Sequence, residues 1–518
     1  MRLSIILSVV FQFFPHVFIA QNILISDQND PCEPSIMMNP NNTDILVAGS
    51  ILNNVHRSND GGITWTSSIL SSSFGVWGDP VIDVDTSGHF YYFHLSNPPT
   101  GDWIDRIVCQ KSTNNGATWN NGTGIGLVSP KEQDKQWSIV NRLNNHIYLT
   151  WTQFDEYGST DPADSSIIRF SKSVDGGITW SEPIRISAQA GDCIDEDNTV
   201  EGSTPAIGPN GEIYVAWAGP QGIVFNKSLD EGETWLSEEI LVNSMPGGWD
   251  YSIPGIQRAN GFPVTKCDLS GGSAHGTIYI NWTDQRNGLS NTDVWLSKST
   301  DGGLSWSEAL KVNDDTTNTH QFFTWMDIDQ STGKLYFIFY DRRNYPDTRT
   351  DVYMAISVDN GNSFINRLIS ESPFVPNSGI FFGDYTNITA HNDVVRPIWT
   401  RLNSGDLSIW TDVSPINEII TGKNEIDKLE SSSIYQFPNP AKEISYVSFK
   451  LKGKSIVSLE LFDDSGRLVH SLKKDEPMDY GKYIIPIYID ELGLPSGTYN
   501  CILSINNKSK NLRTVILD

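Results

Sequence analysis

The stretch SNDGGITW (58–65) decides the fold of this chain, because near-copies of it recur along the sequence. The copies read STNNGATW from 112, SVDGGITW from 173, SLDEGETW from 228, STDGGLSW from 299 and SVDNGNSF from 357. In this pattern the Asp can accept hydrogen bonds from the amides of its own turn, a Gly supplies a positive φ, and the aromatic ring can wedge between two sheets. Each copy is therefore predicted to be a structural hairpin turn.

The spacing of these turns points to a ring of similar units. The closing aromatic residues stand 54 to 71 residues apart, which suits the four-stranded blade of a β-propeller with long loops. A looser repeat precedes each turn, as in PAIGPNGEIYVAWAG from 205, and such units begin near 33, 79, 136, 203, 264, 324 and 382. We predict seven blades, with six as the alternative. The seventh unit lacks a fourth strand, which QNILISD (21–27) is predicted to supply so that the ring closes.

The six octapeptides resemble the Asp boxes of the sialidase superfamily. The resemblance implies an all-β chain that folds as a β-propeller over 21–415, with the Asp boxes on the face away from the active site. The loops that enter the blades and the loops between second and third strands then share the opposite face. We expect the chemistry on that face, because loops on a rigid scaffold carry most functional residues.

Aromatic, acidic and cationic residues concentrate in those loops. The entering loops include VWGDP (76–80), EQDKQW (132–137), TVEGS (199–203), GGWDYSIPGIQRANGFP (247–263), THQFFTW (319–325) and FFGDY (381–385). Trp137 and Trp325 are expected to contact substrate, with a plug of the central channel as the alternative. Aromatic rings can stack on a sugar, and arginine side chains can bind a carboxylate or sulfate with two hydrogen bonds, so these loops suit an acidic sugar.

Similarity to sialidases also implies a Tyr nucleophile activated by a Glu, an Asp acid/base, and three arginines that hold the substrate carboxylate. On this chain the resemblance suggests Tyr385 as nucleophile, Glu201 as its partner, and Asp79 or Asp134 as acid/base. The candidate substrate-binding arginines are Arg258, Arg286, Arg342, Arg343 and Arg401. Loop-bracing ion pairs are the alternative for these arginines. The Phe-Arg-Ile-Pro motif of sialidases has no counterpart, since the corresponding strand, CEPSIMMNP (32–40), contains no Arg.

The start of the chain and its charge indicate an exported protein. Residues 1–20 combine a basic Arg2, an apolar run and a small Ala20, the pattern of a secretory signal peptide. The net charge of −26 lies entirely before residue 421, and it disfavours nucleic acid and anionic membrane surfaces as partners. No later segment is long and apolar enough to span a membrane.

Neither the cysteines nor the acidic runs specify a cofactor. The five cysteines lack the spacing of metal ligands. The runs DVDTSG (83–88) and DCIDEDN (192–198) are candidate calcium sites, but they lack the full ligand spacing of an EF-hand. Solvated acidic turns are the alternative for both runs.

The sequence pattern changes after Trp410. A polar stretch predicts a linker over 416–434, and short alternating strands over 435–518 predict a small C-terminal β-sandwich. The Pro-Asn-Pro start at 438–440, LFDDSGRLV (461–469) and LPSGTY (494–499) resemble the C-terminal sorting domain of the type IX secretion system of Bacteroidota. This resemblance implies release or cell-surface attachment, with the secretion machinery as a partner.

The sequence therefore predicts a secreted, sialidase-like propeller that acts on extracellular, acidic glycans or glycoproteins as an exo-glycosidase. Two alternatives stay open. One is a propeller that binds glycans or proteins without catalysis. The other is a lyase that cleaves acidic polysaccharide by elimination, with His320 or a Tyr as base.

Overall fold

A computed structural model describes residues 21–403, 405–416 and 435–516, the last range with gaps at 438, 440, 443, 452–453, 464–465, 480, 490–491 and 507. The predicted signal peptide and all but the first residue of the predicted linker lie outside the described residues. The elements of the described residues are β-strands, which confirms the all-β class. They form two compact units, one up to Ile416 and one from residue 435. Among these residues there is no apolar helix of membrane-spanning length.

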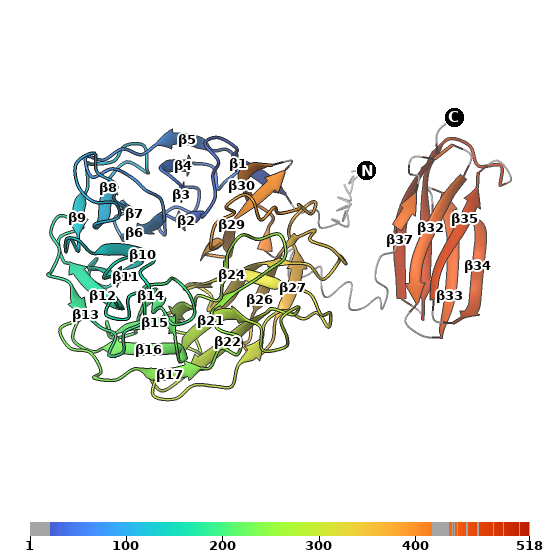
Figure 1. Ribbon diagram of the computed structural model, residues 1–518. Coiled ribbons are helices and arrows are strands. Elements are labelled where there is room, and N and C mark those ends of the chain that lie inside the picture. Colours follow the sequence, from blue (N-terminus) through green and yellow to red (C-terminus); the bar gives the residue numbers. More distant parts are fainter. Residues whose placement is uncertain are drawn as a thin grey trace, which may run out of the picture. The chain divides into compact units, whose positions relative to one another are not determined.

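Seven four-stranded antiparallel sheets make up the first unit, and Figure 1 shows them arranged in a ring. From the first strand outward, the first four sheets contain β2 (Ser35–Met38), β3 (Leu46–Ser50), β4 (Asn54–Ser58) and β5 (Thr66–Ile69); β6 (Val81–Val84), β7 (Phe90–Leu95), β8 (Ile107–Ser112) and β9 (Thr123–Ile125); β10 (Glu132–Val140), β11 (Ile147–Phe154), β12 (Ser166–Ser173) and β13 (Ile184–Arg185); and β14 (Glu201–Ile207), β15 (Ile213–Gly219), β16 (Gly222–Ser228) and β17 (Ile240–Asn243).

The remaining three sheets complete the ring. They contain β20 (Val264–Cys267), β21 (Ile278–Asp284), β22 (Asp293–Ser299) and β23 (Leu310–Lys311); β24 (Gln321–Asp329), β25 (Lys334–Asp341), β26 (Asp351–Ser357) and β27 (Ile365–Leu368); and β28 (Asn387–His391), β29 (Val394–Asn403), β30 (Asp406–Asp412) and β1 (Asn22–Ser26). The N-terminal strand β1 pairs antiparallel with β30 and so completes the seventh sheet. A small hairpin, β18 (Asp250–Tyr251) and β19 (Ala259–Asn260), interrupts the loop between the fourth and fifth sheets.

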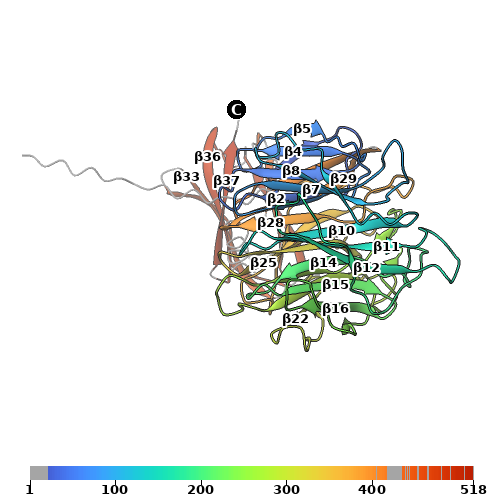
Figure 2. The same ribbon diagram turned by 90° about the vertical axis from the view of Figure 1, so that its left-hand side faces the viewer.

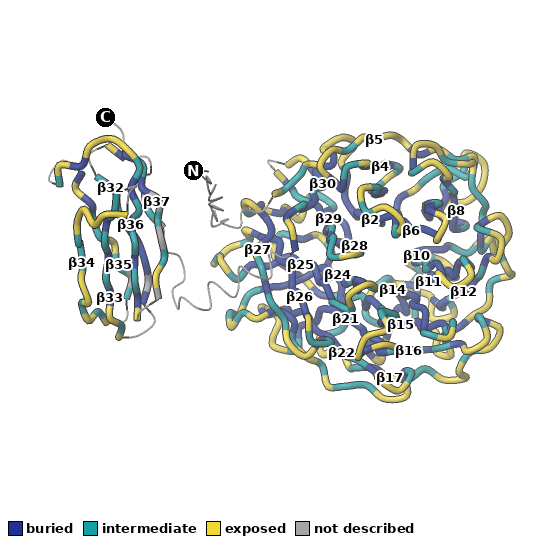
Figure 3. Tube along the Cα trace, turned by 180° about the vertical axis from the view of Figure 1, so that it is seen from behind, coloured by how far each residue is buried: buried dark blue, intermediate teal, exposed yellow. Residues whose placement is uncertain are grey.

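Burial follows the position of a strand within its sheet. Every residue of β7 (FYYFHL) and β11 (IYLTWTQF) is buried, because both faces of these sheets pack against neighbouring sheets. Every residue of the outermost strand β5 (TSSI) is exposed. Figure 2 shows β2, β10, β14 and β28 gathered in the middle of the unit, and Figure 3 shows the exposed residues at its rim.

The octapeptide turns join the third and fourth strands and are held by their own side chains. In the first copy, Thr64 N and Oγ1 donate to the two oxygens of Asp60 at 2.9 and 2.6 Å, and Gly62 N donates to Ser58 Oγ at 2.9 Å. The closing aromatic ring packs between sheets, as Trp306 of the fifth sheet does against Phe225 of the fourth at 5.2 Å. These contacts give the turns a structural role on the face opposite the entering loops.

We expect Gly303→Ala to destabilise the propeller strongly. Gly303 has φ +83°, and an added Cβ would lie 2.3 Å from the buried ring of Phe225. A left-handed backbone conformation and overpacking together should cost about 3 kcal/mol or more. The matched control is Gly271→Ala, where φ is +76° and no atom lies within 4 Å of the added Cβ. Thermal unfolding should separate the two variants, and equal melting temperatures would contradict the clash.

The second unit is the expected β-sandwich. One sheet contains β31 (Tyr435–Phe437), β32 (Ile444–Leu451) and β35 (Gly481–Tyr488), and the other contains β34 (Leu468–Met478), β33 (Ser455–Asp463), β36 (Gly497–Ile505) and β37 (Lys508–Ile516). Buried Val447 and Phe449 of the first sheet share a core with Leu459 and Leu503 of the second.

Candidate functional site

The first strand of several sheets carries a bulge where it enters from the loop face. In β10 the pairing register shifts between Asp134 and Trp137, and in β14 it shifts between Glu201 and Thr204. A bulge inserts an unpaired residue and re-aims its side chain. At the equivalent position of five sheets the backbone has a positive φ, at Glu33, Asp79, Lys135, Gly202 and Phe323. The repeated distortion turns side chains of the entering loops toward one another at the end of the ring axis.

Two cations and six carboxyl groups meet there. The six, which we call the axial carboxyl cluster, are Glu33, Asp79, Asp134, Asp195, Glu201 and Asp384. Lys135 Nζ lies 2.9 Å from Asp384 Oδ2 and 3.2 Å from Asp79 Oδ2. Arg258, from the loop that carries the β18–β19 hairpin, forks onto Asp384 and places Nη1 3.1 Å from Asp195 Oδ2. These ion pairs link entering loops from different sheets.

The neighbouring cations and burial act in opposite directions on the pKa values of Asp384 and Asp134. Burial alone would raise the pKa of Asp384, but Lys135 and Arg258 outweigh burial and lower that pKa. Burial raises the pKa of Asp134 to about 7, although Lys135 acts against the shift. Asp384 is therefore ionised at neutral pH, whereas Asp134 changes its charge near neutrality.

Glu201 is fully buried, and neither carboxyl oxygen receives a hydrogen bond from an N–H or O–H group of the described residues. Its polar neighbour is the carboxyl group of Asp195, and two carboxyl groups form a hydrogen bond only when one carries a proton. Burial, and then Asp195, raise the pKa of Glu201 well above its usual value. Burial and Asp79 do the same for the pKa of Glu33. Burial and the neighbouring carboxyl groups therefore favour the protonated forms of Glu201 and Glu33.

Tyr385 lies beside this cluster, with a buried hydroxyl that has no hydrogen-bond partner among the described residues. Burial, followed by Asp79 and Glu33, raises the pKa of Tyr385 well above its usual value, so the phenol is neutral. Glu201, the expected partner of Tyr385, instead lies beside Asp195 and Asp134.

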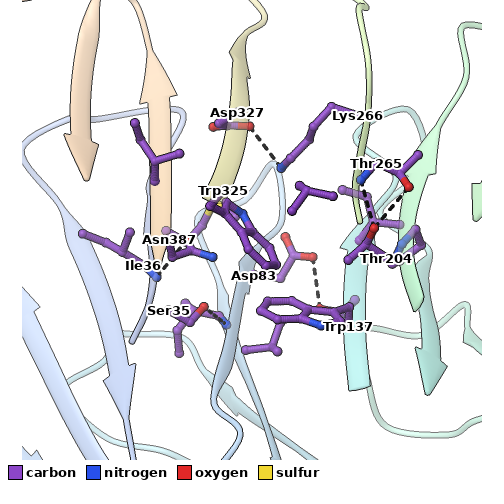
Figure 4. Close-up of a pocket in the computed structure, with 18 residues that line it drawn as sticks. Ser35, Ile36, Asp83, Trp137, Thr204, Thr265, Lys266, Trp325, Asp327 and Asn387 are labelled. Atoms are coloured by element: carbon purple, nitrogen blue, oxygen red, sulfur yellow. Dashed lines mark hydrogen bonds and ion pairs between the residues drawn. The ribbon is translucent and has the colours of Figure 1, made fainter. Parts of the chain in front are cut away.

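Trp137 and Trp325 fill the axis beneath the cluster. Their ring centroids are 4.3 Å apart, and Tyr385 packs against Trp137 at 5.2 Å. Both indoles line a cavity of about 20 Å³ next to Lys135 and Tyr385, and both also line a second cavity of about 50 Å³. Figure 4 shows the second cavity, where an ion pair joins Lys266 and Asp327 beside Trp325. The two indoles thus separate two small cavities along the axis.

The structure does not bring the other four candidate arginines to the axis. Arg286 forks onto Asp284 and also reaches Asn243 at the end of the outer strand β17. Arg343 pairs with Asp341 at 2.7 Å and donates to Asn366 of the outer strand β27. Arg286 therefore connects the end of β21 to the outer strand of the preceding blade, and Arg343 connects the end of β25 to the outer strand of its own blade.

Arg342 and Arg401 are also held by local partners. Arg342 Nε donates to Thr350 at 3.1 Å, while its buried Nη2 reaches no acceptor among the described residues. Arg401 donates to Ser372 Oγ at 2.8 Å. His320, the candidate base for elimination, contacts Thr292 outside the cluster, and burial lowers its pKa to about 4.

Four residues of the site were not predicted from the sequence, namely Glu33, Lys135, Asp195 and Asp384. Glu33, Lys135 and Asp384 stand in the entering stretches CEPS, DKQW and GDYT, each two or three residues before the inward-facing part of a first strand. Aligning the repeats on their first strands places these three residues at nearly equivalent positions, and this alignment would have predicted all three. Asp195 could not be found in this way, because it comes from the DCIDEDN run outside the first strands.

Each candidate calcium run contains a turn that an aspartate side chain stabilises. Asp85 accepts hydrogen bonds from Ser87 N, His89 N and Tyr91 Oη within or next to DVDTSG. In DCIDEDN, Asp192 accepts from Ile194 N. No group of three or more His, Cys, Asp or Glu side chains in the described part of the chain is placed to hold a metal ion.

The raised pKa of Asp134 predicts a pH-dependent effect of Asp134→Asn on stability. An unfolded Asp has a pKa of about 3.9, so between about pH 4 and pH 7 the folded chain holds this proton more tightly. The stability that this proton supplies is lost as the pH rises through that window. Buried His56 and His94 have the opposite effect on stability as the pH rises, because burial lowers their pKa values to about 3 and about 4.

Comparing the variant with the wild type cancels the histidine contribution. The melting temperature of Asp134→Asn, relative to the wild type, should rise between about pH 4 and about pH 7 and level off above that. A difference that stays constant over this range would mean that Asp134 ionises normally in the folded state.

Comparison with known proteins identifies the C-terminal unit. Residues 435–517 match the family described as secretion system C-terminal sorting domain. The chain is therefore secreted through the type IX system and lies outside the cell or on its surface. No curated protein sequence matches the chain significantly.

Several solved structures resemble the chain at low identity. A Hadza microbial sialidase is 15% identical, with a TM-score of 0.41, and the match covers 72% of this chain and 73% of that one. An ulvan lyase bound to -[GlcA(1-4)Rha3S]- is 13% identical, with a TM-score of 0.46 and coverage of 75% and 95%. An α-L-arabinofuranosidase from Fusarium graminearum is 12% identical, with a TM-score of 0.42 and coverage of 77% and 98%. At these values the likenesses say nothing about activity.

Proposed function

We propose that this secreted propeller is a glycoside hydrolase whose acid and base groups belong to the axial carboxyl cluster. The proposal rests on one observation: the surroundings shift the pKa values of neighbouring carboxyl groups in different directions. Burial favours the protonated form of Glu201, Asp134 titrates at about 7, and Lys135 and Arg258 keep Asp384 ionised. Glycoside hydrolysis by paired carboxyls needs one that donates a proton to the leaving oxygen and one that is ionised.

Within this proposal, Glu201 donates its proton to the leaving glycosidic oxygen as the C–O bond breaks, and ionised Asp134 takes a proton from the water that attacks the anomeric carbon. Asp79 positions Lys135 through their ion pair, and Lys135 in turn holds Asp384. Tyr385 serves as a neutral wall of the site. A Tyr nucleophile is not part of the proposal, because no base accepts a hydrogen bond from its hydroxyl among the described residues.

The charges favour a neutral sugar over the acidic glycan that the sequence suggested. Arg258 and Lys135 are already paired with Asp384, Asp195 and Asp79, so neither is left to bind a substrate carboxylate. The surrounding carboxylates would repel a substrate anion, whereas they can accept hydrogen bonds from neutral sugar hydroxyls. We therefore assign neutral glycans as the substrate class.

Substrate entry requires the loop of Arg258 to move. The Arg258 side chain is 36% exposed, while the Asp384 carboxylate beneath it is almost completely buried. Arg258 therefore covers the cluster from the solvent side. Active-site closure by such a loop excludes water and completes the site once substrate is bound.

One observation favours a second candidate, a propeller that binds glycans without cleaving them. The carboxyls of the cluster are largely buried, and the cavity beside Tyr385 measures only about 20 Å³, less than a sugar ring needs. In that case the ion pairs would serve only to join the sheets.

An assay of product release separates the two candidates. The mature secreted protein would be incubated with neutral glucans, xylans, mannans and galactans, and with sialylated and uronate-containing glycans, and new reducing ends would be measured. Turnover of at least one neutral glycan is expected. Binding without turnover would establish the second candidate, and turnover of sialylated glycans alone would overturn the assignment of neutral substrates.

A further inference from the structure

Two large aromatic side chains on the loop face of the propeller are partly exposed to solvent. Trp77 is 38% exposed and Trp103 is 41% exposed, and their rings meet edge to face with centroids 6.4 Å apart. We call these two side chains the indole pair. Exposed aromatic area on an otherwise charged surface is costly in water, and it commonly marks a binding site.

The backbone under the indole pair is fixed. Trp77 N donates to Leu95 O at 3.0 Å, which anchors the loop that leads directly into Asp79. The neighbour of Trp103, Ile104, is fully buried, and its N–H donates to Ser96 O at 3.0 Å. Rigid aromatic side chains lose little entropy when they bind a ligand, so this surface is preorganised.

A row of contacts connects the indole pair to the axial carboxyl cluster. Trp103 packs against Tyr157 at 5.7 Å, and Tyr157 Oη donates to Asp195 Oδ2 at 2.5 Å. Asp195 is the carboxyl that pairs with Glu201 and also binds Arg258. A chain molecule lying on the indole pair would therefore point toward the proposed proton donor.

The polar groups around the indole pair select against anions. The nearby cations are already paired, Lys131 with Asp155 at 2.5 Å and Arg106 with Asp105 at 2.6 Å. Asp102 lies next to Trp103 in the chain, and Glu132 accepts a hydrogen bond from Tyr157 N. Burial, and then the nearby Glu156 and Asp102, raise the pKa of Glu132, which places these carboxyls in one electrostatic neighbourhood.

We propose that the indole pair binds the sugar units of a neutral glycan chain that extends from the axial carboxyl cluster. The apolar C–H face of a pyranose packs against an indole, and its outward hydroxyls can donate to the surrounding carboxylates. The edge-to-face arrangement presents ring faces in two directions. The direction of the chain rests on the proposed hydrolase function, whereas binding by the indole pair does not.

Calorimetric titration of the mature full-length protein tests this binding. The probes are neutral hexasaccharides of glucose, xylose, mannose and galactose, with hexagalacturonate as the acidic comparison. At least one neutral probe should bind, and Trp77→Ala and Trp103→Ala should each weaken it by roughly tenfold or more. The control is Leu229→Ala, which alters a side chain that is 72% exposed in an Asp-box turn on the opposite face and should leave affinity unchanged.

Oxidation of tryptophan in the wild type gives a readout that does not depend on variant folding. N-bromosuccinimide followed by peptide mass mapping should show that the bound neutral hexasaccharide protects Trp77 and Trp103, while hexagalacturonate does not. Unchanged oxidation, undiminished affinity of both Ala variants, or no binding of any neutral probe would overturn the proposal. Protection without hydrolysis would overturn only the proposed activity, and hydrolysis without protection would overturn only the role of the indole pair.

Discussion

Asp384→Asn is expected to lower the free energy of unfolding of the propeller by roughly 3–5 kcal/mol. Asp384 is the carboxylate that Lys135 and Arg258 share, and all three lie where the entering loops meet. Removing its charge leaves two cations in a buried setting without their main partner, and a buried unpaired charge costs several kcal/mol. Because the pairs join loops of different sheets, the ring itself should melt earlier.

Scanning calorimetry of the full-length chain checks this expectation, with Asp347→Asn as the matched control. Asp347 forms an ion pair with Arg349 at 2.9 Å, but both side chains are about half exposed. Exposed pairs of this kind contribute little, so the control should melt like the wild type. If Asp384→Asn also melts like the wild type, the axial ion pairs do not stabilise the ring.

Glu201→Gln is expected to lower the turnover of neutral glycans by about 10²–10⁴-fold, the usual contribution of a general acid. The structural consequence should be small or favourable. A Gln amide has the shape of a protonated Glu and can donate a hydrogen bond to Asp195, so the buried contact between the two side chains is kept. Lost turnover together with retained stability would therefore separate catalysis from folding.

The control for this variant is Glu212→Gln. Glu212 lies in the turn at the far end of the same strand pair, β14 and β15, where it accepts hydrogen bonds from Asn210. Its replacement should leave turnover unchanged. Equal turnover of Glu201→Gln and the wild type would remove Glu201 from the mechanism.

The sequence predicts the frame of this protein well because the frame depends on local interactions. An Asp box such as SNDGGITW closes through Asp60, Ser58 and Thr64, all within eight residues, so its structure is readable from the chain. The period of these turns then defines the repeating units. The strand order of each unit also predicts which loops share one face, and on that face the structure brings Asp79, Asp134, Glu201, Arg258 and Tyr385 together.

The pairing within the site could not be predicted, because it depends on which loops meet at the axis. Glu201 meets Asp195 from the preceding loop instead of Tyr385, and Lys135 enters the centre through a bulge with φ 50°. Arg286 and Arg343 resemble substrate-binding arginines in sequence, but each folds back onto a carboxylate two residues away. Such local ion pairs compete with any distant partner, and only the folded geometry decides between them.

The most direct measurement is the pH dependence of kcat/KM for a neutral glycan, in the wild type and in Asp134→Asn. If the axial carboxyl cluster performs the hydrolysis, the wild-type rate should rise with pH through an apparent pKa of about 7, as Asp134 ionises. Asp134→Asn should lose this rising limb together with most of its activity. An unchanged limb in Asp134→Asn, or no turnover by the wild type at any pH, would contradict a catalytic role for the cluster.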